Sequence, residues 1–99
     1  MTDIDKMTDA ELGEAIMREV RSVPFGDATS VMATVALLDW LVEHTHDVSI
    51  TREKIGVYRG VYFVIVIVDR GAIYTHADTL PRAVAEAALR VARELNSDE

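Results

Sequence analysis

The sequence contains no cysteine, which excludes disulfide bonds, a thiol nucleophile and a thiolate metal site. Its glycines are isolated from one another, so it has no glycine-rich loop of the kind that binds phosphates. The longest run of apolar and aromatic residues, at 61–68, is less than half of the roughly 20 residues that span a bilayer. The N-terminus is acidic and polar, unlike a signal peptide. We therefore expect a soluble protein of the cytoplasm.

Basic residues are scarce as well, because 10 Lys and Arg stand against 17 Asp and Glu, for a formal net charge of −7. This balance disfavours non-specific binding to nucleic acid or to anionic membranes, and it suits a basic protein surface. Six of the acids lie near the N-terminus: Asp3, Asp5, Asp9, Glu11, Glu14 and Glu19. A simpler explanation is that acidity keeps a small domain in solution.

A length of 99 residues, 49% of them hydrophobic, predicts a single domain over residues 1–99, with flexible tails at 1–7 and 96–99. Residues 61–68 are all apolar or aromatic and mostly β-branched, which predicts a strand. Side chains of a strand point alternately to the two faces of a sheet, so both faces of this strand are apolar. We therefore expect layers of helix on both sides of the sheet.

Two helices are predicted ahead of the strands. Thr8 and Glu11 match a capping box, which predicts a helix from Asp9 to Arg21. Asp27 is a candidate cap for a second helix, which would run from Ala28 to Glu43 or His44.

The second predicted helix is apolar almost all round. One stripe consists of Val31, Val35, Leu38 and Val42, and another consists of Leu37, Trp40 and Leu41. Such a helix is normally buried on more than one side. It packs between the sheet and the first helix, or its Trp40 side meets a second copy of the chain.

Three strands joined by short turns are predicted next. Residues 48–51 alternate between apolar and polar, and a change of parity at 52–54 indicates a bulge or short loop before 55–57. Strands at 61–68 and 72–76 follow, so the three form an antiparallel meander with 61–68 in the centre.

A last helix is predicted from about Leu80–Pro81 to Leu95, rich in alanine and therefore able to approach the sheet closely. Arg82, Glu86 and Arg90 stand four residues apart and are expected on its solvent side. The predicted fold is α+β with the order α-α-β-β-β-α. Its antiparallel meander is sandwiched between helices as a three-layer α/β/α structure, with the last helix on one face and the first two on the other.

Residues 77–89 read ADTLPRAVAEAAL. This segment resembles the start of the last helix in small phage and prophage proteins of the phage ABA sandwich domain family, and the likeness extends over about residues 9–95. It implies a three-layer fold and a phage or mobile-element origin. The chain departs from the family in having Trp40 alone near the second helix and mainly Val and Ile in the central strand. The family has no established catalytic residues, so none is carried over.

Histidine and aspartate residues gather where the predicted elements end. His44, His46 and Asp47 form one group, and His76 with Asp78 forms another. If these ends met, they would offer ligands to a divalent metal. The spacing matches no standard zinc site, and polar residues commonly collect at the ends of helices and strands. We therefore predict no metal and no cofactor.

Enzyme activity and nucleic-acid binding are not expected. The chain has no nucleophile elbow, and Asp69 and Asp78 fit turn and cap positions. The sequence has four basic residues around the hairpins: Arg52, Lys54, Arg59 and Arg70. A double-stranded-RNA-binding domain has a similar element order. Its last helix begins with lysines, however, whereas this one begins with Leu80–Arg82.

The remaining class is a protein-binding module. We hypothesise that it inhibits a host defence complex, such as a CRISPR effector, by presenting carboxylates where that complex expects phosphates. The residues expected to contact the partner are Asp9, Glu11, Glu14 and Trp40. The alternative is a structural or housekeeping phage protein that acts as a homodimer.

Overall fold

A computed structural model of the protein describes residues 3–20, 30–57 and 59–96, and the structural statements below concern these residues. Their secondary structure consists, in chain order, of the 3-10 helix η1 (Ile4–Lys6), α1 (Asp9–Glu19), α2 (Val31–His44), β1 (Asp47–Arg52), β2 (Tyr62–Val68), β3 (Gly71–Ala77) and α3 (Leu80–Asn96). The predicted α+β class and the predicted order α-α-β-β-β-α are both confirmed.

The strands form one antiparallel sheet in the order β1-β2-β3, so the apolar strand β2 is central, as predicted. Val66 pairs with Val48 of β1 and with Ile73 of β3. Val64 and Val66 are fully buried, whereas Ile67, which points to the other face, is 39% exposed. The two faces of β2 therefore have different surroundings, although both are apolar.

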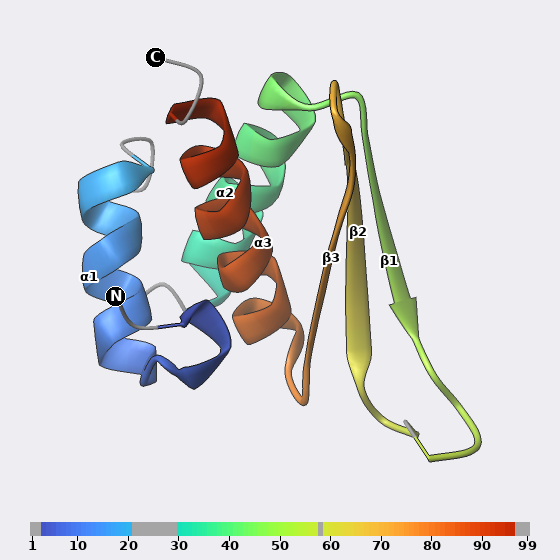
Figure 1. Ribbon diagram of the computed structural model, residues 1–99. Helices are drawn as coiled ribbons and strands as arrows, with labels where there is room; N and C mark the ends of the chain where they lie inside the picture. Colours follow the sequence, from blue (N-terminus) through green and yellow to red (C-terminus); the bar gives the residue numbers. More distant parts are fainter. Residues whose placement is uncertain (1–2, 21–29, 58, 97–99) are drawn as a thin grey trace.

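The helices lie on one side of the sheet (Figure 1). α3 packs against β2 and β3, α2 packs against α3 and makes a smaller contact with β1, and α1 packs on α3, farthest from the sheet. Three layers are present, in the order α1, then α2 with α3, then the sheet. The helical cover that was expected on the second face of the sheet is not found among the described residues. Tyr74, on that face, is 68% exposed.

α3 is the element around which the others pack. It contacts α1, α2, β2, β3 and η1. Its buried residues lie all round the helix and include five alanines: Ala83, Ala85, Ala87, Ala88 and Ala92. Because alanine adds so little to the helix radius, neighbours can approach α3 closely on several sides. The prediction that Glu86 faces solvent is wrong, because it is only 4% exposed.

The helix ends confirm one predicted cap and replace another. Thr8 and Glu11 form the predicted capping box, in which the Glu11 backbone N–H donates to Thr8 Oγ1 at 3.1 Å and the Thr8 backbone N–H donates to Glu11 Oε1 at 3.0 Å. α1 ends at Glu19, with Val20 as its C-cap. α2 begins at Val31, and its N-cap Ser30 accepts a hydrogen bond from the Ala33 backbone N–H. The predicted cap Asp27 lies outside the described residues.

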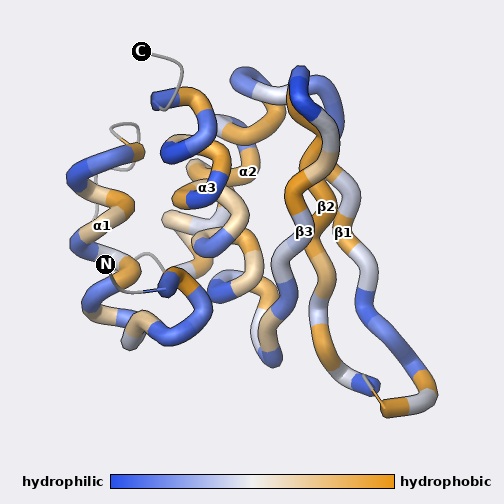
Figure 2. The backbone as a smooth tube through the Cα atoms, viewed as in Figure 1, coloured by the Kyte–Doolittle hydropathy of each residue, from blue (hydrophilic) through white to orange (hydrophobic). Residues whose placement is uncertain are grey.

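Residues 53–57 belong to a loop, so the first strand does not resume at 55–57 after a bulge, as the parity change had suggested. Ile55 and Val57 are 83% and 95% exposed. Gly56 and Gly60 have φ values of 92° and 86°, a region that glycine adopts without a Cβ clash. The change of apolar parity after Thr51 thus marks the end of the strand. Figure 2 shows the loop extending beyond the helices, with its apolar residues at the tip.

No helix in the described part of the chain is both long enough and apolar enough to cross a membrane.

Candidate functional site: the open face of the sheet

Two of the three acidic residues predicted to contact a partner, Asp9 and Glu11, have roles within the chain's own fold. Asp9 Oδ1 lies 2.8 Å from Arg82 Nη1. Glu11 belongs to the capping box, where hydrogen bonds from the backbone and then from the side chain of Thr8 lower the pKa of its carboxyl group. Glu14 is exposed on α1. Two of the three acids therefore stabilise the start of α1.

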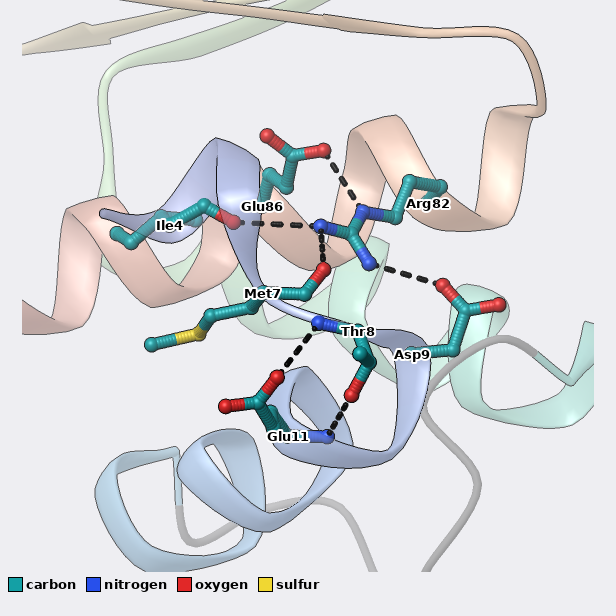
Figure 3. A network of polar contacts seen from close by, with 7 residues as sticks. All are labelled: Ile4, Met7, Thr8, Asp9, Glu11, Arg82 and Glu86. Carbon is teal, nitrogen blue, oxygen red and sulfur yellow. Dashed lines mark hydrogen bonds and ion pairs between the residues drawn. The ribbon is translucent and has the colours of Figure 1, made fainter. Parts of the chain in front are cut away.

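Arg82 is the centre of the polar network in Figure 3. Its Nε donates to Glu86 Oε2 at 2.9 Å, and its Nη2 donates to the carbonyl oxygens of Ile4 and Met7 at 3.2 and 2.6 Å. Burial alone would lower the pKa of Arg82, but Glu86 and Asp9 outweigh it and raise that pKa. The network fastens η1 and the start of α1 to α3. Residues 3–7 are thus not a tail, and Ile4 is only 6% exposed.

A polar hollow of about 610 Å³ lies beside this network, between η1, β3 and the start of α3. Arg82 and Arg90 line it, and the buried Nε of Arg90 has no hydrogen-bond partner in the part of the chain that the structure describes. Four carboxylates line it too: Asp5, Asp9, Asp78 and Glu86. Because the carboxylates outnumber the guanidinium groups, the hollow disfavours an anionic ligand.

The two groups of histidine and aspartate residues that were weighed as metal ligands are not brought together. His46 Nε2 contacts the carboxylate of Asp69, and His44 stacks on Trp40 with ring centroids 4.6 Å apart. His76 pairs with Phe63 on β2, whereas Asp47 pairs with Ile67, about 13 Å farther along that strand. Within the described ranges, no three His, Asp or Glu side chains are placed to share a metal ion.

The predicted cluster of basic residues is divided between the two ends of the sheet. Arg52 ends β1, with its guanidinium 5.5 Å from the ring centroid of Tyr62, and Lys54 and Arg59 lie in the adjacent loop. Arg70 lies in the turn between β2 and β3, at the opposite end, 3.8 Å from Glu94. The described residues thus form no continuous basic stripe from these four side chains.

Trp40 packs into the core, with 8% of its surface exposed. Its face of α2 is the buried one, together with Ala33, Leu37 and Leu41. It is therefore not available as an exposed contact for a partner or for a second copy.

The face of the sheet on which the described residues place no helix carries an apolar surface that we call the open face. Its residues are Phe63, Ile65, Ile67, Tyr74 and His76. Ile65 lies opposite Tyr74, and Phe63 lies opposite His76, with their rings stacked and centroids 5.7 Å apart. The side chains of β1 on this face, Ser49 and Thr51, are exposed and polar. An apolar centre with a polar border is typical of surfaces that bind proteins.

The sequence held a signal for the open face, although the apolar run of β2 concealed it. Val48 and Ile50 of β1 alternate with Ser49 and Thr51, a pattern that indicates one solvated face. The neighbouring strand, rather than β2 itself, therefore indicates which face is open.

Comparisons of the chain with protein-family models, with curated protein sequences and with solved structures found no match. The resemblance of residues 77–89 to the phage ABA sandwich domain family stays a prediction.

Proposed function

We propose that this protein is a non-enzymatic protein-binding module that contacts its partner through the open face. The observation that carries the proposal is the exposed apolar row on β2 and β3, in which Ile67 is 39% and Tyr74 is 68% exposed. The polar residues described above mostly have partners in the fold, whereas no helix of the described ranges lies over this apolar row. Covering such a row removes apolar area from water, which favours association.

The chemistry of the partner follows from the charge of the chain. With a net charge of −7, the protein attracts a surface on which basic residues border an apolar patch. In this proposal the partner is a host protein complex in the cytoplasm, and binding inhibits it. The resemblance to phage proteins supports that choice of partner. The carboxylates of Asp9 and Glu11 are already engaged within the fold, so the open face supplies the contact and the overall charge steers it.

The experiment compares two matched variants of a tagged protein. Ile67→Lys places a cation in the open face, and Met17→Lys places a cation on α1, where Met17 is 51% exposed. Partner proteins captured from host lysate are identified, purified and titrated against each variant. We expect Ile67→Lys to weaken binding at least about tenfold, because it desolvates a charge against a basic partner.

Met17→Lys should bind as the unmodified chain does, and added salt should weaken binding of both. Equal affinity of the two variants for the purified partner would contradict the proposal.

A further inference from the structure

α2 presents a second apolar surface, on the side away from Trp40. Val31, Val35 and Val42 are 76%, 56% and 66% exposed, and Leu38 between them is partly buried. At 3.6 residues per turn, these four side chains fall within about 60° of the helix circumference. We call them the α2 stripe. A surface helix normally turns its polar side outwards, so this stripe marks a contact.

The spacing of the α2 stripe indicates that a helix covers it. Successive residues of the stripe, Val31, Val35, Leu38 and Val42, are four, three and four positions apart. This spacing is typical of the seam along which one helix packs lengthwise on another. The stripe is also symmetric about the point midway between Ala36 and Leu37. A two-fold axis through that point sets Val31 opposite Val42 of the second helix, and Val35 opposite Leu38. The stripe is therefore complementary to itself when the two helices run antiparallel.

The charges on α2 favour the same direction. Its first turn carries no acidic residue, whereas Asp39 and Glu43 lie in its C-terminal half, both exposed. In a parallel pair the four acids of the two helices would gather at the same end of the pair, where like charges repel one another. In an antiparallel pair each Glu43 lies near the N-terminal end of the other α2, where the helix dipole attracts negative charge.

We propose that the α2 stripe pairs with the α2 stripe of a second copy of this chain, antiparallel and about a two-fold axis. The pairing uses a different surface from the open face, so it does not depend on the function proposed above. A helix of 14 residues is about 21 Å long, and a contact of this length is small among specific interfaces. The pair therefore forms reversibly, with a dissociation constant of about 1 µM or weaker.

Sedimentation velocity on the full chain, from about 1 µM to about 1 mM, is the first measurement. We expect a concentration-dependent shift from monomer to dimer. Val35→Glu should abolish the shift, because it places two carboxylates in the centre of the seam. Ile67→Glu, on the open face, should leave it unchanged. A chain that stays monomeric throughout, or a dimer that Val35→Glu leaves intact, overturns the proposal.

Cross-linking tests the direction and does not depend on how Val35→Glu folds. The chain has no cysteine, so Val31→Cys and Val42→Cys each introduce a single thiol at an exposed site. We expect the mixture of the two proteins to oxidise to the mixed disulfide at least about tenfold faster than either protein alone. Faster pairing of Val31→Cys with itself would indicate parallel helices and overturn the proposal. Loss of a different protein's binding on Val35→Glu, with no dimer, would assign the stripe to that protein and overturn it too.

Discussion

Arg82 and Glu86 have a sequence spacing typical of an exposed helix face, but in the structure they belong to a largely buried cluster. The spacing of Arg82, Glu86 and Arg90 is that of ion pairs on an exposed helix face. In the structure the side chains of Arg82 and Glu86 are only 15% and 6% exposed, because η1 and the start of α1 lie over this face of α3. The side chain of Arg82 satisfies two backbone carbonyl groups of the segment that covers it.

Replacing Arg82 by Met should lower the free energy of unfolding by about 3 kcal/mol, because it leaves the buried carboxylate of Glu86 without its cation. Urea denaturation of the variant and of the unmodified chain measures this difference. The double variant Arg82→Met with Glu86→Gln should recover part of the loss, since it removes the buried charge. Arg18→Met is the control, because the Arg18 side chain is 67% exposed and its loss should cost less than about 0.5 kcal/mol. Equal effects of Arg82→Met and Arg18→Met would contradict a structural role for the network.

At the scale of elements, α3 takes the central position that the sequence indicated for β2. β2 is central only within the sheet, whereas α3 contacts both other α-helices and two strands. The alanines make this position possible, because a helix that is enclosed on several sides has no room for larger side chains. The alanines of α3 therefore allow close packing of its neighbours, in addition to favouring the helical conformation.

Ala88→Leu should destabilise the protein by about 1–3 kcal/mol, because the added atoms have no space around the fully buried Ala88. Ala10→Leu, at an exposed position of α1, makes the same change and should alter stability by less than about 0.5 kcal/mol. Denaturation midpoints at equal m-values provide the comparison. If Ala88→Leu were neutral, α3 would be less tightly enclosed than the structure shows.

In the molecule as a whole, the sheet has a buried face and an open face, and adjacent side chains of β2 point to opposite faces. Substitutions at two adjacent positions therefore compare the two faces. Val66→Thr should lower the free energy of unfolding by about 1–3 kcal/mol, because it buries a hydroxyl group beneath the helices, where Val66 has no exposed surface. Ile67→Thr should lower the free energy of unfolding by clearly less, since Ile67 is 39% exposed in the monomer.

These two stabilities are to be measured by urea denaturation at a low protein concentration, at which the monomer predominates. Equal costs for Val66→Thr and Ile67→Thr would show that the second face is covered as well. In that case the open face could not be the contact proposed here.

Local patterns were sufficient to predict the elements and some of their ends. The capping box of Thr8 and Glu11 needs only four consecutive residues, so the sequence predicts it directly. The order of the strands follows from short turns, which join neighbours in an antiparallel meander. The availability of the residues expected to bind a partner could not be predicted from local patterns. Asp9, for example, forms an ion pair with Arg82, which lies 73 residues away in the chain.

Residue patterns were enough to predict the α+β class, the order of the elements, the central place of β2 in the sheet and the stripes of α2. Which of these apolar surfaces became core depends on how the elements pack in three dimensions. Periodicity shows which side chains share a face, but it does not show what covers that face. Both faces of β2 and two sides of α2 are apolar, and the helices cover one face of each. The uncovered faces, the open face and the α2 stripe, are therefore where we place the contacts with other molecules.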